Sequence, residues 1–351
     1  YAKWTANTYT VSFDSQGGST PSPTTITVTY GSTYGPLATT IRGGYTFGGW
    51  WTGPGGTGVQ VSAATSVTIT ANQTLYAKWT ANTYTVSFDS QGGSTPSPTT
   101  TTVTYGGTYG PLATTTRSGY AFAGWWTGPG GTGAEVTPTT PVTITAGQTL
   151  YAKWTANTYT VSFDAQGGST PSPTSTTVTY GGTYGPLATT MRAGYGFSGW
   201  WTGPGGTGAE VTPTAPVAIT ANQTLYAKWT VNTYTVSFDS QGGSTPSPTT
   251  TTVTYGGTYG PLATTTRSGY TFAGWWTGPG GTGAEVTPTT PVTITADQAL
   301  YAKWTANTYT VSFDSQGGST PSPTTITVTY GSTYGPLATT TRSGYTFAGW
   351  W

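Results

Sequence analysis

The sequence repeats itself every 75 residues. The tetrapeptide Tyr-Ala-Lys-Trp begins at residues 1, 76, 151, 226 and 301, with no insertion or deletion between copies. Four full periods cover 300 residues, and a fifth continues to Trp351. A period this regular indicates that one small unit is copied in tandem and docks on its neighbours. The length of 351 residues therefore does not indicate two or three ordinary domains.

The composition excludes several kinds of chemistry. The chain has no cysteine and no histidine, which excludes disulfides, thiolate metal sites and the usual general base near neutral pH. Charged residues make up only 5%, and the dispersed Lys and Arg form no tract for nucleic acid. No apolar run reaches the roughly 20 residues of a membrane span. We expect no enzyme activity, no catalytic or metal-binding residue and no cofactor.

The aromatic content indicates a folded protein. Gly 53 and Pro 25 alone would suggest disorder, but 15 Trp, 25 Tyr and 10 Phe accompany abundant Thr and Val. Disordered chains are poor in these residues, whereas strands separated by turns are rich in them. A surface of Thr, Ser, Gly and Asn is common in extracellular bacterial proteins. We therefore expect an extracellular location, secreted or on the cell surface.

The second unit shows how each copy is built. Residues 84–89 alternate apolar and polar side chains, which is typical of a strand with one buried face. Further strands are predicted at residues 99–105, 119–126, 134–136 and 150–154, separated by Gly- and Pro-rich turns. The pattern predicts an all-β, mostly antiparallel sheet with little or no helix.

Ten side chains of the second unit are predicted to form its core. Burial of each large side chain stabilises the fold by roughly 1.5–3 kcal/mol. They are Tyr84, Val86, Phe88, Val103, Tyr105, Leu112, Phe122, Ile144, Leu150 and Trp154.

An ordered set of motifs resembles the Listeria–Bacteroides repeat, also called the internalin B-repeat. In the second unit these are Tyr84-Thr-Val-Ser-Phe-Asp89, Gln91-Gly-Gly93, Val103-Thr-Tyr-Gly-Gly107, Arg117-Ser-Gly-Tyr120, Phe122-Ala-Gly-Trp125 and Leu150-Tyr-Ala-Lys-Trp154. The resemblance implies a tandem array of small β-grasp-like repeats from a bacterial secreted or surface protein. Such repeats commonly act as a spacer or stalk, and sometimes in adhesion, and carry no known catalytic residues. The units here are unusually uniform, since units two and four differ only at Ala121/Thr271, Gly147/Asp297 and Thr149/Ala299.

The repeat boundaries are predicted to lie just after each Tyr-Ala-Lys-Trp. Four residues, such as 155–158, would then connect one unit to the next. The expected division is residues 1–8 as the last strand and connector of a preceding repeat, complete repeats at 9–79, 84–154, 159–229 and 234–304, and a truncated repeat at 309–351.

Each unit contains a pair of adjacent tryptophans, and neighbouring residues on a strand point to opposite faces. Strand parity places the second member on the same face as Tyr120 and the predicted core residue Phe122, so the first member is the candidate interface or ligand residue. A bulge at Gly124 would exchange the two. The outward member could pack within or between repeats, form a lateral protein interface, or stack on a glycan. The candidates are Trp50, Trp125, Trp200, Trp275 and Trp350.

An acidic and a basic residue recur at the ends of two strands that we expect to be neighbours. Their simplest interpretation is a partly exposed ion pair, worth about 0–1 kcal/mol. The alternative is a spontaneous Lys–Asp isopeptide cross-link assisted by Glu135, which requires a buried triad; unit one has Gln60 at that position. The residues are Asp14, Lys78, Asp89, Lys153, Asp164, Lys228, Asp239 and Lys303.

Two hypotheses for function follow. The first is a structural array, acting as a stalk or as a fibre or filament in which copies associate, because the sequence begins and ends inside a unit and resembles a slice of a longer polymer. The second is a multivalent adhesin that binds glycan or a host surface protein through repeated aromatic residues, where many weak sites combine by avidity. The partners expected are neighbouring repeats, other copies of the chain, and glycan or a host protein, with no nucleic acid and no membrane-spanning segment.

Overall fold

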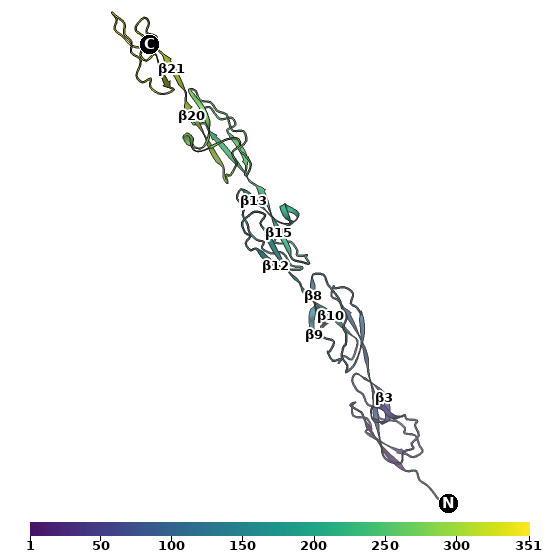
Figure 1. The fold of residues 1–351 in the computed structure, drawn as a ribbon. Helices are drawn as coiled ribbons and strands as arrows, with labels where there is room; N and C mark the ends of the chain where they lie inside the picture. Colours follow the sequence, from purple (N-terminus) through teal and green to yellow (C-terminus); the bar gives the residue numbers. More distant parts are fainter. The chain divides into compact units, whose positions relative to one another are not determined.

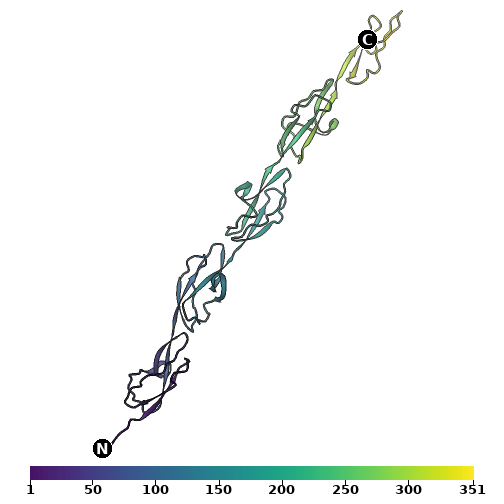
Figure 2. The same cartoon turned by 180° about the vertical axis from the view of Figure 1, so that it is seen from behind.

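The computed structural model describes residues 1–351 (Figure 1; Figure 2 gives the view from behind). The chain divides into two compact units. The first consists of Tyr1–Tyr159, Val178–Gly182 and Pro216–Ala221, and the second of Thr160–Thr177, Thr183–Ala215 and Asn222–Trp351. We number the repeats 1 to 5 in chain order, and they correspond to residues 9–79, 84–154, 159–229, 234–304 and 309–351.

Each of repeats 1 to 4 forms a single five-stranded sheet. Repeat 1 contains β1 (Thr8–Asp14), β2 (Thr25–Thr29), β3 (Tyr45–Gly53), β4 (Thr57–Val61) and β5 (Gln73–Ala81), and repeat 2 contains β6 (Thr83–Asp89), β7 (Thr100–Thr104), β8 (Tyr120–Gly128), β9 (Thr132–Val136) and β10 (Gln148–Ala156). Repeat 3 contains β11 (Thr158–Asp164), β12 (Ser175–Thr179), β13 (Tyr195–Gly203), β14 (Thr207–Val211) and β15 (Gln223–Val231). Repeat 4 contains β16 (Thr233–Asp239), β17 (Thr250–Thr254), β18 (Tyr270–Gly278), β19 (Thr282–Val286) and β20 (Gln298–Ala306). Repeat 5 contains the hairpin of β21 (Thr308–Ser312) and β22 (Thr325–Thr329).

The fold is all-β, as the sequence predicts. The helical segments are single 3₁₀ turns of three residues, at Pro54–Gly56, Pro129–Gly131, Pro204–Gly206 and Pro279–Gly281. Glycine and proline occupy all of these turns, so no side chain favours their extension into a longer helix. None of these helices has the length or the apolar character needed to cross a membrane.

The sheet of repeat 2 has the strand order β7-β6-β10-β8-β9, and Figure 1 shows β8, β9 and β10 together. Its hairpins, β6 with β7 and β8 with β9, are antiparallel, and so is the pairing of β8 with β10. The central pairing of β6 with β10 is parallel, and joins Val86 to Gln148 and Asp89 to Tyr151. The expectation of a mostly antiparallel sheet therefore holds for three of the four pairings. A parallel partner requires a long return connection, which the segments between β6 and β10 supply.

The core of repeat 2 lies between the sheet and the loops that cover one of its faces. Strand residues Val86, Phe88, Val103 and Leu150 are buried, as predicted. The core also contains residues outside the ten predicted from the sequence. These are Tyr109, Ala113, Trp125, Val136, Val142 and Ala152.

A bulge in β8 decides which tryptophan is buried. The register against β10 shifts between Phe122 and Trp125, where Gly124 has a φ of +99°. Such a φ is open to glycine but strained for other residues. The bulge turns Trp125 inward, where it is 1% exposed and its Nε1 donates a hydrogen bond to the Ala113 carbonyl at 2.7 Å.

The first tryptophan of each pair is therefore a core residue, and the expectation that it faces a ligand or partner is corrected. Trp50, Trp200 and Trp275 are 2%, 1% and 1% exposed, and each donates Nε1 to a backbone carbonyl. Trp350 in repeat 5 is half-buried and donates to the Ala338 carbonyl at 2.8 Å. The structure therefore has the alternative arrangement considered in the sequence analysis, in which a bulge at the glycine exchanges the two tryptophans.

One predicted core residue lies on the same face as Trp125 but is only partly covered. Phe122 is 42% exposed and lies at the surface, where its ring packs edge-on against Trp125 and Trp154. Tyr105 is half-buried at the end of the repeat rather than in its core. The remaining predicted residues pack around the core and are partly buried: Tyr84, Leu112, Ile144 and Trp154.

The connector between repeats is almost entirely strand. β5 continues to Ala81 and β6 begins at Thr83, so only Asn82 separates them. The same one-residue gap follows β10, β15 and β20. The chain therefore passes from one sheet to the next without a flexible loop.

The position of the two tryptophans predicts a large difference in stability between their alanine variants. Replacement of Trp50, Trp125, Trp200 and Trp275 by Ala should lower the free energy of unfolding by about 3–5 kcal/mol per repeat, because each leaves a core cavity. Replacement of Trp51, Trp126, Trp201 and Trp276 should cost about 1 kcal/mol, since these side chains are half-buried. Chemical denaturation of the two fourfold variants measures both values, and the opposite order would contradict the bulge.

Candidate functional site

No cluster of chemically reactive side chains marks a catalytic centre. The structure contains no group of three or more His, Cys, Asp or Glu side chains that could hold a metal ion. The features that recur in every repeat are contacts at the sheet ends and on the outer sheet face. We therefore build the candidate site from these contacts.

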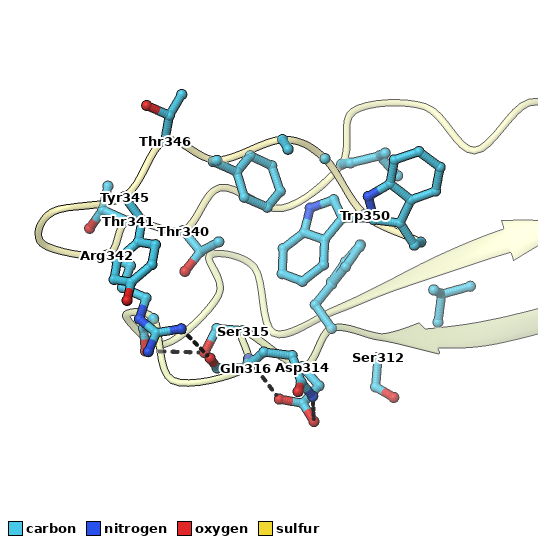
Figure 3. Close-up of a pocket in the computed structure, with 18 of the residues that line it drawn as sticks. Ser312, Asp314, Ser315, Gln316, Thr340, Thr341, Arg342, Tyr345, Thr346 and Trp350 are labelled. Carbon is cyan, nitrogen blue, oxygen red and sulfur yellow. Dashed lines mark hydrogen bonds between the residues drawn. The ribbon is translucent and has the colours of Figure 1, made fainter.

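A cavity lies in repeat 5 (Figure 3). It has a volume of about 900 Å³ and is lined by residues that include Val311, Phe313 and Trp350. The residues of repeat 2 that correspond to these three pack against Leu150 and Ala152 of β10. The cavity thus occupies the position that the last strand fills in a complete repeat, so we do not regard it as a ligand site.

The junction between repeats 1 and 2, within the first compact unit, is held by one asparagine. The Asn82 backbone N–H donates to the Gly44 carbonyl of repeat 1 at 2.9 Å. Its own carbonyl accepts a hydrogen bond from the Tyr105 N–H of repeat 2 at 2.9 Å. Asn82 therefore extends the hydrogen-bond ladder of both sheets, and its side-chain amide donates to the Tyr84 hydroxyl at 3.3 Å.

Aromatic side chains cover the same junction. The Tyr45 and Tyr105 rings meet edge to face with centroids 5.5 Å apart. The Arg42 guanidinium lies 4.0 Å from the Tyr45 centroid on the repeat 1 side. Such aromatic and cation–π contacts each contribute about 0.5–1.5 kcal/mol.

A glycine makes room for this packing. Gly44 has a φ of +79°, and a Cβ at this position would collide with the Tyr105 ring. Glycine is required twice here, once for the left-handed backbone and once for the close approach of the ring. The residue that ends the loop before β3 is thus part of the surface on which the next repeat docks.

The second compact unit contains two junctions of the same construction. Asn232 N–H donates to the Gly194 carbonyl at 2.9 Å and Asn307 N–H to the Gly269 carbonyl at 2.9 Å. The ring pairs are Tyr195 with Tyr255 at 5.8 Å and Tyr270 with Tyr330 at 5.6 Å. The sequence shows the tyrosines and the Gly-Tyr step at the start of the third strand in every copy, but it does not show that they meet at the junction.

The outer face of each sheet carries a lysine on a tryptophan. Lys153 Nζ lies 4.2 Å from the Trp126 ring centroid, and the lysine stem packs where Gly131 has no side chain. The corresponding distances are 4.5 Å for Lys78, 4.2 Å for Lys228 and 4.1 Å for Lys303. The ammonium group covers one face of the half-buried indole and restricts access to it.

The predicted Asp–Lys pair is replaced by other contacts. β6 and β10 are neighbours as expected, but the Asp89 carboxylate accepts the Gln91 N–H at 2.9 Å in the turn after β6. Gln91 has a φ of +49°, which this hydrogen bond helps to hold. Asp14, Asp164 and Asp239 cap the same turn, while Lys78, Lys228 and Lys303 lie over tryptophan. Because Asp89 is exposed, the buried triad of an isopeptide cross-link is not formed.

A side chain before the last strand extends the central parallel ladder in three of the four complete repeats. Thr10 N–H on β1 donates to Asn72 Oδ1 at 3.0 Å, one residue before β5 begins. Asn222 and Asp297 accept equivalent hydrogen bonds from Thr160 at 2.9 Å and Thr235 at 2.8 Å. Repeat 2 has Gly147 at this position and therefore no side-chain acceptor.

A buried tyrosine fastens a covering loop to the start of the last strand. The Tyr109 hydroxyl donates to Gln148 Oε1 of β10. Burial raises the pKa of Tyr109 above its ordinary value of 10.0, because the ionised phenolate would lose its hydration. Tyr34, Tyr184 and Tyr259 show the same upward pKa shift from burial.

Comparisons with known proteins agree with the repeat organisation. The Listeria-Bacteroides repeat domain matches residues 9–78, 84–153, 159–228, 234–303 and 309–351. A "Putative Gly-rich membrane protein" of Evansella cellulosilytica is 34% identical over 355 residues, which cover 100% of this chain and 40% of that protein. Internalin H of Listeria monocytogenes is 40% identical over 86 residues, 24% of this chain and 15% of that protein.

A second protein of Evansella cellulosilytica, a "Putative membrane protein", is 35% identical over 317 residues. That match covers 88% of this chain and 45% of the relative, so the chain spans less than half the length of both Evansella proteins. A solved structure of two B repeat units of the collagen binding protein of Staphylococcus aureus covers 86% of this chain and 100% of that structure, with 9% identity and a TM-score of 0.13. We base no argument on so low a TM-score.

The missing acceptor in repeat 2 predicts a stabilising substitution. Gly147→Asn should raise the free energy of unfolding of repeat 2 by about 1 kcal/mol through the new hydrogen bond to Thr85. Loss of glycine flexibility in the unfolded chain should add about 0.5 kcal/mol. Gly147→Ala is the matched control, because it gains only the second effect. Equal stabilities of the two variants in chemical denaturation would contradict a role for the side-chain acceptor.

The raised tyrosine pKa values predict a loss of stability at alkaline pH. In the unfolded chain these tyrosines ionise near pH 10, whereas in the folded repeat they stay protonated to higher pH. Their contribution to the free energy of unfolding is therefore fully present below about pH 10 and declines above it, because the tyrosines of the unfolded state lose their protons first. Chemical denaturation between roughly pH 8 and pH 11 measures the decline. Phe at positions 34, 109, 184 and 259 should make it shallower, and an unchanged decline would contradict this assignment.

Proposed function

Because the chain belongs to the Listeria–Bacteroides repeat domain family, we propose that it is a structural repeat array of an extracellular bacterial surface protein. In this proposal the array acts as a stalk, or as a fibre where copies associate, and holds other parts of the protein at a distance. It has no catalytic role. The names of the relatives, two membrane proteins and an internalin, support a location at the cell surface.

The observation that carries the proposal is the junction built on Asn82. A stalk needs successive units that keep a defined relation to each other, and a loop of flexible residues would not provide one. Here a single residue joins two strands and is hydrogen-bonded to both repeats. The Tyr45–Tyr105 contact adds a packed surface on one side of the chain.

The uniformity of the repeats supports the same proposal. Repeats 2 and 4 differ at only three positions, and two of these lie away from the junction bonds. At the third, Thr271 in repeat 4 donates to the Asn307 side chain at 2.6 Å, while repeat 2 has Ala121. Each copy therefore presents the same junction glycine, tyrosines and asparagine, as expected for copies with one mechanical task.

The adhesin hypothesis rested on repeated Trp and Tyr, and it loses the tryptophans. In repeats 1 to 4 the first tryptophan of each pair is buried, and the second is half-buried beneath a lysine ammonium group. A glycan-stacking platform needs an aromatic face open to the ligand. We therefore do not propose glycan binding through these tryptophans.

Alanine at the junction glycines tests the stalk directly. Gly44, Gly119, Gly194 and Gly269 should be changed together, because a Cβ at each would collide with a tyrosine ring. We expect the repeats to stay folded while small-angle X-ray scattering reports a broader distribution of particle dimensions. An unchanged scattering profile would argue against the junction as the element that fixes neighbouring repeats.

The chain offers a matched control at four other glycines. Gly55, Gly130, Gly205 and Gly280 have φ values of +68°, +67°, +65° and +65°, and a methyl group added at any of them would meet no atom within 4 Å. Alanine there carries the same backbone strain, about 1–2 kcal/mol per residue, without the collision. This control should leave the particle dimensions unchanged, and a chain lacking one repeat should be shorter in proportion.

A further inference from the structure

We propose that each complete repeat is a mechanical clamp that resists tension applied through the chain. The inference rests on the proposed function as a stalk, because it concerns the load that a stalk transmits. It goes beyond that function by naming the element that bears the load. This element is the parallel pair formed by the first and last strands of each repeat.

The direction of the load follows from the strand topology. In repeat 2 the chain enters through β6 and leaves through β10, and these strands are parallel neighbours. The entry point at Thr83 precedes the paired segment, and the exit at Ala156 follows it. Tension on the two ends therefore pulls the strands past each other along their length. All the rungs from Val86–Gln148 to Asp89–Tyr151 are then loaded together rather than in succession.

The core resists the same movement. Val86 and Phe88 on β6, and Leu150 and Ala152 on β10, are all buried in one cluster. Phe88 also packs against Trp125, with ring centroids 4.8 Å apart. Because protein interiors are closely packed, the two strands cannot slide by a residue without displacing these side chains.

The junction transmits force directly from one repeat to the next. Asn82 is the only residue between β5 and β6, and its backbone is hydrogen-bonded in both directions. A force on β5 therefore reaches β6 through one peptide unit on each side. A longer connector would extend first and would separate the mechanical response of the two repeats.

Sequence differences among the copies change the number of hydrogen bonds that hold the first and last strands together. Asn72, Asn222 and Asp297 each add one hydrogen bond at the end of the parallel ladder, and Gly147 does not. The bond in repeat 1 joins Thr10 on the first strand to a residue directly before the last strand. Repeat 2 thus lacks this hydrogen bond, whereas its Ser87 and Thr149 hydroxyls, 3.0 Å apart, form a side-chain hydrogen bond between β6 and β10.

Single-molecule force spectroscopy of the whole chain tests the clamp. The chain has no cysteine, so an introduced pair defines the points of attachment. Thr83→Cys with Thr155→Cys pulls β6 against β10 in shear. Ala121→Cys with Thr155→Cys pulls apart two residues that face each other across β8 and β10, and so opens that pairing one rung at a time. The two geometries share one anchor and the same folded repeat.

We expect a several-fold higher unfolding force in the shear geometry. The length released identifies the event, since about 24 nm corresponds to residues 83–155 and about 12 nm to residues 121–155 at full extension. In the shear geometry Gly147→Asn should raise the force, and Gly147→Ala should not. Equal forces in the two geometries, or equal effects of the two substitutions, would overturn the clamp.

The outcome also separates the clamp from the stalk. Equal unfolding forces in the two geometries, together with scattering dimensions that change when the junction glycines are substituted, would contradict the clamp but support the stalk proposal. A high unfolding force in shear, together with scattering dimensions that do not change when the junction glycines are substituted, would contradict the stalk proposal but support the clamp.

Discussion

The parallel pairing of the first and last strands is the interaction on which the rest of each repeat depends. Parallel neighbours run in the same direction, so the chain enters a repeat at one end of the sheet and leaves at the other. This arrangement allows β5 to continue into β6 with only Asn82 between them. An antiparallel pairing would return the chain to the end where it entered and would require a longer link to the next copy. The sheet topology thus lets each copy continue directly into the next, in keeping with the uninterrupted 75-residue period of the sequence.

Glycines with positive φ place the aromatic residues that complete this plan. Gly124 forms the bulge that turns Trp125 into the core, and Gly44 accepts the Tyr105 ring of the following repeat. One glycine therefore acts on stability within a repeat, and the other on the contact between repeats. The high glycine content, which alone would suggest disorder, provides conformations that the other residues rarely adopt. The structural role proposed for the array depends on both positions.

The sequence alone predicts the period, the all-β class and the alternation of the first strand, because these follow from spacing and pattern. Val86, Phe88 and Leu150 were correctly placed in the core for that reason. The prediction for Trp125 was wrong because a one-residue bulge reverses strand parity after Phe122, and pattern alone does not reveal whether a bulge occurs. Phe122 keeps the core face but is 42% exposed, and alternation does not show how far the covering loops reach over that face. The Asp89–Lys153 pair failed for a different reason: each side chain has a closer partner, a turn N–H and an indole ring respectively. The junction contacts and the acceptor at Asn72 lie between residues far apart in sequence, so only the folded structure assembles them.

Amide hydrogen exchange at the junction asparagines measures directly whether neighbouring repeats are joined by a continuous hydrogen-bond ladder. Selective ¹⁵N labelling of asparagine makes Asn82, Asn232 and Asn307 visible beside Asn7, which precedes β1. We predict slow exchange at the three junction amides, because each donates to the carbonyl of the glycine before the third strand of the preceding repeat. Exchange at these positions as fast as at Asn7 would show that the repeats are joined by flexible links, and would contradict the account.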